Sequence, residues 1–244
     1  MIDFKYADLF KQNSVDVQLE IISDDEKIHI TNTEFHEEEF ELTESLCSQS
    51  ELTFGAVEAG SVKFKVSNIF LPMKGRWMTV KMIIGGHTDQ PFLIGRFKGY
   101  SDTPTADRKY RDVVAYDALY DILNADVAAW YNTVFPSHKE QQTDKDGNKT
   151  TVTVYDPVTM KQFRDSFFKH FGIEQADIDL INDNMSIEKT VAVTASSETS
   201  SDTEESSTIG ESVSGKEVLS CICEINGCMG HMGRDGKFHY IYLE

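Results

Sequence analysis

The chain has 244 residues, enough for one large domain or two small ones, and its 41 acidic and 23 basic side chains give a net charge of −18. This charge excludes the usual electrostatic route to nucleic-acid binding, in which a basic surface neutralises phosphates. The simplest explanation of the acidity is that it keeps the protein soluble. No run of about 18 apolar residues occurs, so we expect no membrane-spanning helix, and the N-terminal residues lack the features of a secretory signal.

The first half of the chain has the pattern of short β-strands separated by turns. Residues 62–66 alternate strictly between apolar and polar side chains, which is typical of a half-buried strand. The other expected strands are 15–22, 27–31, 36–42, 52–56, 78–84, 92–98 and 110–116. Short strands at this regular spacing are typical of antiparallel barrels and sandwiches. The sequence therefore predicts an antiparallel β-barrel domain over residues 1–116.

The period of the apolar pattern changes at Asp117, a residue type that often precedes a helix. We expect three helices in the remaining chain. They cover about 117–131, about 157–171 after the pair Asp156-Pro157, and about 215–226 after the capping-box residues Ser214 and Glu217. Gly172 is the expected stop of the second helix. These helices predict a second domain of mixed α+β structure over residues 117–244, so the fold class is α+β.

Strands and loops are expected between and after these helices. Residues 136–149 are polar and predict an exposed hairpin tip that leads into a strand at 150–155. A further strand is expected at 187–193. Residues 195–207 contain Ser, Thr and Glu without aromatic or basic side chains, so they predict a mobile loop. The chain ends in a predicted hairpin of strands 228–232 and 237–243.

Two patterns resemble metal sites, but neither meets the requirements of one. Cys221, Cys223, Cys228 and His231 offer ligand types for zinc. The first two are two residues apart on a predicted helix and therefore point about 200° apart, so small buried side chains are the preferred interpretation. Residues 144–148 resemble the start of a calcium-binding loop, but Lys149 and Tyr155 occupy the positions that need glycine and glutamate.

Paired carboxylates and a cysteine were weighed as catalytic groups. Asp117 with Asp121, and the run Glu37-Glu38-Glu39 after His36, are most simply a helix start and a solvated face. The neighbours of Cys47 give no reason for a lowered thiol pKa. We find no nucleophile elbow, phosphate loop or dinucleotide motif. The sequence thus predicts no enzyme, with no catalytic, cofactor-binding or metal residues and no cofactor.

Several runs resemble a known family. Similar runs in the first half are Phe54-Gly55-Ala56-Val57-Glu58-Ala59, Gly95-Arg96-Phe97, Thr105-Ala106-Asp107-Arg108-Lys109-Tyr110 and Ala115-Tyr116-Asp117. Later runs are 214–219, Asn226-Gly227 and Arg234-Asp235-Gly236. Together they resemble the N-terminal baseplate-hub region of tail-associated proteins of long-tailed phages and prophages. These motifs are structural, and none is catalytic.

The resemblance implies a homotrimeric ring at the tail tip of a virion, built in the bacterial cytoplasm. Its expected partners are copies of itself, the distal tail protein, the tape-measure protein, and distal fibre or lysin modules. The barrel would continue the tail channel, and DNA would pass without specific binding; an acidic lining would suit that passage. Because hub regions in this family carry a second barrel after this point, the chain is expected to be a fragment with an open strand edge.

A binding module of another class is the alternative. A receptor- or glycan-binding module of a phage tail would need exposed aromatic rings beside carboxylates or amides. The available rings are Trp77, Trp130, Tyr131, Tyr240 and Tyr242. All five lie on strand or helix patterns that suit core packing, so the structural role is the preferred hypothesis. A hydrolase is a more distant third hypothesis.

Overall fold

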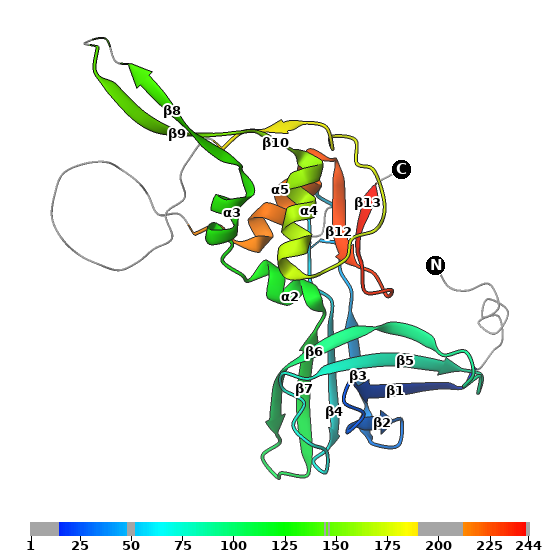
Figure 1. Ribbon diagram of the computed structural model, residues 1–244. Helices are drawn as coiled ribbons and strands as arrows, with labels where there is room; N and C mark the ends of the chain where they lie inside the picture. The colour runs from blue at the N-terminus through cyan, green and yellow to red at the C-terminus, as the bar shows by residue number, and fades with distance from the viewer. Residues whose placement is uncertain (1–14, 48–51, 144, 146, 190–211, 243–244) are drawn as a thin grey trace. The chain divides into compact units, whose positions relative to one another are not determined.

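The computed structural model describes residues 15–47, 52–143, 145, 147–189 and 212–242, except for the side chains of residues 37 and 38. The fold is α+β, with mostly antiparallel strands and a few helices (Figure 1). The described residues form two compact units. The first contains those within 1–48, 58–120 and 231–239, and the second contains those within 49–57, 121–230 and 240–244. The predicted division into domains 1–116 and 117–244 stays a prediction.

The first unit is built on one seven-stranded antiparallel sheet with the order β2-β1-β5-β6-β7-β4-β3. Its strands are β1 (Val17–Ser23), β2 (His29–Thr31), β3 (Phe35–Thr43), β4 (Ser61–Ser67), β5 (Trp77–Ile84), β6 (Phe92–Pro104) and β7 (Tyr110–Tyr116). The predicted strands 15–22, 27–31, 36–42, 62–66, 78–84, 92–98 and 110–116 are confirmed within a few residues. The prediction at 52–56 is wrong, because these residues form a turn at Phe54 and Gly55 and none of them lies in a strand.

The two edge strands of this sheet, β2 and β3, are consecutive in the chain and are linked by residues 32–34 alone. Four Cα–Cα steps reach at most about 14 Å, whereas the edges of a flat sheet of seven strands lie about 29 Å apart. The sheet therefore has to curl until its edges approach each other. Glu34 fixes the turn, since its carboxylate accepts hydrogen bonds from the Thr31 N–H (2.8 Å) and hydroxyl (2.6 Å). The result is the nearly closed barrel that the sequence predicted.

The inner faces of the strands form the core of the barrel. Strict alternation places Val62, Phe64 and Val66 of β4 inside, as predicted. The other buried core residues are Ile21, Ile28, Ile30, Met73, Met78, Val80, Ile94, Phe97, Val113 and Ala115. Met73 comes from the loop between β4 and β5, so this loop belongs to the packed structure and is held in place by its own core residue.

The second unit contains the rest of α2 (Ala118–Leu123), which begins in the first unit, and three further helices, α3 (Ala128–Val134), α4 (Met160–Phe171) and α5 (Gly215–Ile225). Three two-stranded sheets lie in this half of the chain: β8 (Ser137–Thr143) with β9 (Lys149–Tyr155), β10 (Val158–Thr159) with β11 (Ser186–Ile187), and β12 (Cys228–Met232) with β13 (Phe238–Tyr242). The C-terminal hairpin confirms the prediction. Among the described residues, no helix is long and apolar enough to cross a membrane.

The expected single helix over 117–131 is wrong, because the chain forms α2 and α3 with a break between them. The backbone in the break bonds to the segment that precedes α5. The Ala125 carbonyl accepts from the Gly215 N–H, and the Val127 N–H donates to the Val213 carbonyl, both at 2.8 Å. These hydrogen bonds join residues about 90 positions apart, so the local helical pattern could not reveal them.

The start of the second predicted helix also needs correction. Instead of beginning at Pro157, the chain first makes β10, and Thr159 then caps α4 through a capping box with Gln162. Gly172 ends this helix in the left-handed conformation (φ +66°), and Ser214 with Glu217 caps α5, both as predicted. The polar residues 137–143 form strand β8 rather than a hairpin tip. In the predicted strand 187–193 only Ile187 is a described strand residue, and the predicted loop 195–207 lies outside the described residues.

Gly99 of β6 is required by the close approach of the β4–β5 loop. A Cβ atom at this position would lie 2.1 Å from the Met73 carbonyl oxygen, which is a backbone atom and cannot rotate away. We expect Gly99→Ala to lower the free energy of unfolding by about 1–3 kcal/mol through overpacking, measured by urea denaturation. Ser101→Ala, two residues along the same strand, is the control and is expected to change it by less than about 0.5 kcal/mol. Equal stabilities would contradict this account of the loop.

Candidate functional site

The metal-ligand types noted in the sequence do not converge on one point. Cys221 is exposed, whereas Cys223 and Cys228 are buried, and the Cys228 thiol lies 3.4 Å from the Cys223 carbonyl oxygen. His231 instead lies beside His239, with ring centroids 5.8 Å apart. Across the described part of the chain, no group of three or more His, Cys, Asp or Glu side chains could hold a metal ion. Of the loop resembling a calcium site, Gly147 has φ +85°, while residues 144 and 146 are not described.

The candidate catalytic carboxylates have structural partners. Asp117 directly precedes α2, and its carboxylate accepts hydrogen bonds from the backbone N–H groups of Gly60 (2.7 Å) and Leu119 (2.9 Å). Burial raises the pKa of Asp117 to about 6, although these hydrogen bonds act in the opposite direction. Glu39 forms an ion pair with Lys65 (2.7 Å). These contacts describe a helix start and a solvated strand face. The absence of an active site stays a prediction.

Most of the aromatic rings considered for glycan binding are engaged elsewhere. Trp130 is 6% exposed and packs against Phe163 and Phe167, and Tyr240 is 8% exposed. Tyr131 packs against Phe135. The ring of Trp77 is covered by the Arg96 guanidinium at 4.9 Å. Tyr242 differs from the buried Trp130 and Tyr240, since 38% of it is exposed to solvent.

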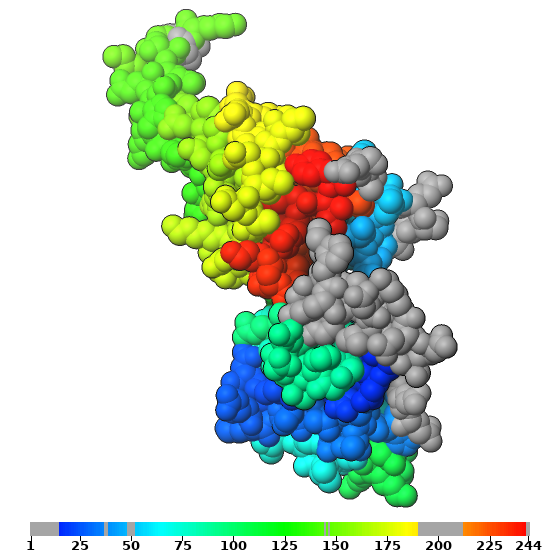
Figure 2. Space-filling view, turned by 90° about the vertical axis from the view of Figure 1, so that its right-hand side faces the viewer, coloured from blue at the N-terminus to red at the C-terminus, as the bar shows by residue number. Residues whose placement is uncertain are grey.

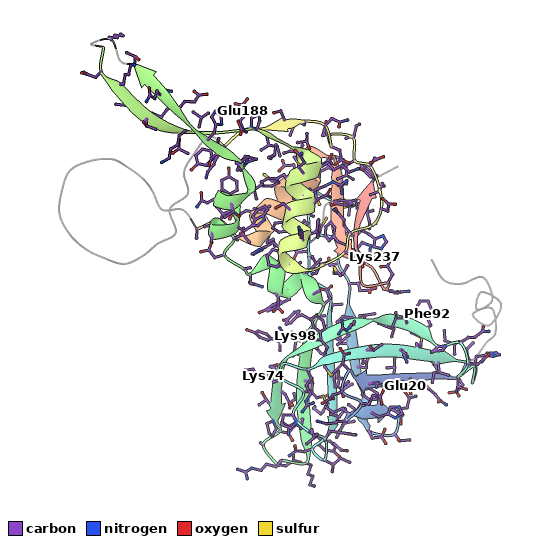
Figure 3. The ribbon with its side chains drawn as sticks, in the orientation of Figure 1. Glu20, Lys74, Phe92, Lys98, Glu188 and Lys237 are labelled. Atoms are coloured by element: carbon purple, nitrogen blue, oxygen red, sulfur yellow. The ribbon has the colours of Figure 1, made fainter. Side chains whose placement is uncertain are left out.

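A surface that the sequence did not reveal lies on the outer face of the barrel. Trp77 of β5, Lys98 of β6 and Tyr116 of β7 are directly opposite one another across three neighbouring strands. Tyr116 stacks on Tyr120 with ring centroids 4.1 Å apart, and Tyr100 meets both rings edge-on. Lys74 is an exposed residue of the β4–β5 loop, and its backbone bridges to Gly99, the residue after Lys98. We call this set, Lys74, Trp77, Lys98, Tyr100, Tyr116 and Tyr120, the tyrosine–lysine patch; Figure 3 shows Lys74 and Lys98 close together on one side of the first unit.

A second surface belongs to the second unit and depends on a buried ion pair. Arg164 of α4 and Asp183 are 2% and 5% exposed, and they form two hydrogen bonds of 2.7 and 2.8 Å. Asp183 also accepts from the Leu180 N–H, and Arg164 also donates to the Ile178 carbonyl and the Gln175 side chain. Burial opposes the charged form of Asp183, but these hydrogen bonds outweigh it and lower its pKa. The loop between α4 and β11 is thereby held rigidly.

This braced loop presents acidic and aliphatic side chains to solvent. Ile181 is 81% exposed and Ile178 is 39% exposed, and the adjacent Asp177 and Asp179 are exposed as well. The Asn182 side chain donates to the Ile225 carbonyl, which fixes the loop against the end of α5. We call residues 174–181 the acidic loop; Figure 2 shows this part of the chain, in yellow, at the surface of the second unit. Ile178 and Ile181 are two exposed aliphatic side chains three residues apart on this loop.

The β8–β9 hairpin is a third exposed feature. Its strands pair from Ser137 with Tyr155 to Thr143 with Lys149, and every residue of β8 is exposed (Figure 1). It pairs with no other described strand. Since a lone two-stranded hairpin is only marginally stable in water, its open edges are suited to pairing with another chain.

Comparison with known proteins identifies a shared fold. No protein-family model matches the chain, and no curated protein matches its sequence. The structure is similar to the crystal structure of the 43 kDa tail protein of prophage MuSo2 from Shewanella oneidensis, with a TM-score of 0.52 and 11% identity over 94% of this chain. It also aligns with prophage tail protein gp18 from Listeria monocytogenes EGD-e, with a TM-score of 0.46 and 12% identity over 92% of this chain. The chain spans 56% and 50% of the length of those proteins.

Substitution of Asp183 tests whether the buried Arg164–Asp183 ion pair stabilises the fold. We expect Asp183→Ala to lower the free energy of unfolding by about 3–5 kcal/mol, because it leaves the buried guanidinium without its counter-charge. Asp179→Ala is the matched control. The Asp179 side chain is 89% exposed in its ion pair with Lys161, so its removal is expected to cost less than about 1 kcal/mol. Urea denaturation at pH 7 measures the free energy of unfolding of both variants. Similar losses in the two variants would contradict the stabilising role of the buried ion pair.

Asp117 generates a prediction about pH. Its pKa is raised in the folded protein from 3.8 to about 6, so between these values the folded state binds a proton that the unfolded state has released. The stabilisation that protonated Asp117 contributes is therefore lost as the pH rises from about 4 to 6, and this loss is on the order of 1–3 kcal/mol. Above pH 6 the contribution of Asp117 no longer changes.

The measurement for Asp117 is the difference in unfolding free energy between the wild type and Asp117→Asn, determined from pH 4 to 8. As the pH rises to about 6, the unfolding free energy of the wild type is expected to fall relative to that of Asp117→Asn, and above pH 6 the difference is expected to stay constant. A difference that is flat throughout, or that moves in the opposite direction, would contradict the raised pKa.

Proposed function

We propose that this chain is a structural subunit of a phage tail, placed at the baseplate hub of the tail tip. The observation that carries the proposal is the fold, a nearly closed antiparallel barrel combined with a mixed unit, which it shares with the MuSo2 tail protein over 94% of its length. The resemblance of runs such as Gly95-Arg96-Phe97 and Ala115-Tyr116-Asp117 to hub regions supports the same conclusion.

In this role the chain assembles with copies of itself into a homotrimeric ring that extends or closes the tail tube. The distal tail protein lies above the ring, the tape-measure protein within it, and distal fibre or lysin modules are attached to it. DNA passes without specific binding, which suits a net charge of −18. The chain acts by contact and without a catalytic centre. Rigid exposed surfaces, such as the tyrosine–lysine patch and the acidic loop, are features that an assembly subunit requires.

A second candidate function is a receptor- or glycan-binding module of the tail. The observation in its favour is the cluster Tyr100, Tyr116 and Tyr120, in which Tyr100 is 52% exposed. Exposed aromatic rings provide stacking surfaces for sugars as well as for proteins. A glycan array distinguishes the two functions, since a ring subunit gives no specific signal, whereas a glycan module gives a signal that Tyr100→Ala removes.

Self-assembly is the direct test of the proposed function. Size-exclusion chromatography with light scattering, run over a hundredfold range of protein concentration, is expected to show a shift from a 27.6 kDa monomer toward a trimer, because association is concentration-dependent. Negative-stain electron micrographs of the largest species should show rings. A chain that stays monomeric at the highest concentration would contradict the proposal.

A further inference from the structure

The tyrosine–lysine patch has the composition of a protein–protein interface. Tyrosine and tryptophan are enriched where proteins bind one another and dominate the energetic centres of such contacts. Here Trp77, Lys98 and Tyr116 lie in a row across three strands, and Tyr100 and Tyr120 pack against Tyr116. The Arg96 guanidinium lies over the ring of Trp77 and adds a further positive charge. Directly opposite residues on neighbouring strands point to the same face, so these side chains share the outer face of the sheet.

The patch is also rigid, which lowers the entropic cost of binding. The segment carrying Lys74 is fixed by hydrogen bonds from the Gly75 N–H to the Gly99 carbonyl (2.7 Å) and from the Met73 N–H to Asp102 (2.6 Å). The Asp102 side chain is 1% exposed and is paired with Arg111. The rings of Tyr116 and Tyr120 hold each other by stacking.

The acidic loop is complementary to this patch in charge and in character. It offers Asp177, and Asp179 beside its own ion-pair partner Lys161, to the lysines. It offers Ile178 and Ile181 to the aromatic rings. It is rigid for a separate reason, the buried pair of Arg164 and Asp183. The chain therefore carries a basic, aromatic surface and an acidic, aliphatic surface that are complementary to each other.

We propose that the tyrosine–lysine patch of one copy binds the acidic loop of the next copy. Because the two surfaces differ, the contact is head-to-tail, and head-to-tail contacts generate rings when the rotation closes. This inference rests on the proposed function, to which it adds the surfaces that meet. The opposite charges bring the copies together in the correct orientation, and burial of Ile181 against the aromatic rings holds them.

A charge-reversal experiment tests the contact with the full chain. Variant one carries Lys74→Glu and Lys98→Glu, and variant two carries Asp177→Lys and Asp179→Lys. Each variant alone brings like charges together and is expected to associate at least about tenfold more weakly than the wild type. A third variant carries all four substitutions, and every contact between its copies joins opposite charges, so its association is expected to return to the wild-type strength. Analytical ultracentrifugation measures the association of the three variants.

The control variant carries Lys27→Glu and Lys109→Glu, two exposed lysines of the first unit outside both surfaces, and changes the net charge by the same amount as variant one. It is expected to associate at the wild-type strength. Circular dichroism and urea midpoints establish that all variants are folded. A two-substitution variant one or two that associates as strongly as the wild type, or a four-substitution variant that fails to recover association, would overturn the inference.

The result for the wild type separates this inference from the proposed function. A wild-type chain that stays monomeric contradicts the proposed function itself, whereas a wild type that assembles through surfaces insensitive to both variants contradicts only the contact proposed here. Binding of a fluorescent single-stranded oligothymidine that is lost in variant one, with self-association unchanged, would assign the patch to nucleic acid and overturn the inference as well.

Discussion

The short link between β2 and β3 is the constraint on which the first unit depends. These strands lie at opposite ends of the sheet order, yet three residues join them. A chain so short cannot cross a flat sheet of seven strands, and the sheet must wrap around its own apolar face. Wrapping buries Val62, Phe64 and Val66 with their counterparts from the other strands. It also turns the polar face of every strand outward, where the tyrosine–lysine patch forms.

Closure of the barrel also explains why position 99 requires glycine and why Asp102 anchors the β4–β5 loop. The β4–β5 loop has to return across the barrel, and its backbone passes so close to β6 that only glycine fits there. The Asp102 carboxylate accepts a hydrogen bond from the Met73 N–H and forms an ion pair with Arg111. These contacts anchor the loop to strands β6 and β7. The buried polar groups of this corner are therefore satisfied within the fold. The same corner sets the position of Lys74 on the surface.

In the second unit, the segment between α4 and β11 is fixed in place although it has no regular secondary structure. The residues between α4 and β11 cannot satisfy their backbone groups through a helix or sheet, and Arg164 with Asp183 does so from the interior. A buried ion pair of this kind contributes little net stability compared with apolar packing, but it fixes one arrangement. The pair therefore contributes more to the specificity of the loop's shape than to its stability.

The amino-acid sequence by itself determined the alternating strands, the α+β class, the caps at Ser214 and Gly172, and the C-terminal hairpin, because each depends on residues near one another in the chain. Only the tertiary structure decided the break between α2 and α3, the late start of α4, and the two candidate surfaces. The break depends on two hydrogen bonds with a distant segment, from the Gly215 N–H to the Ala125 carbonyl and from the Val127 N–H to the Val213 carbonyl. The tyrosine–lysine patch depends on strand order, since Trp77, Lys98 and Tyr116 become neighbours only when β5, β6 and β7 pair in register. A linear pattern specifies which face a side chain takes, but not which strand will lie beside it.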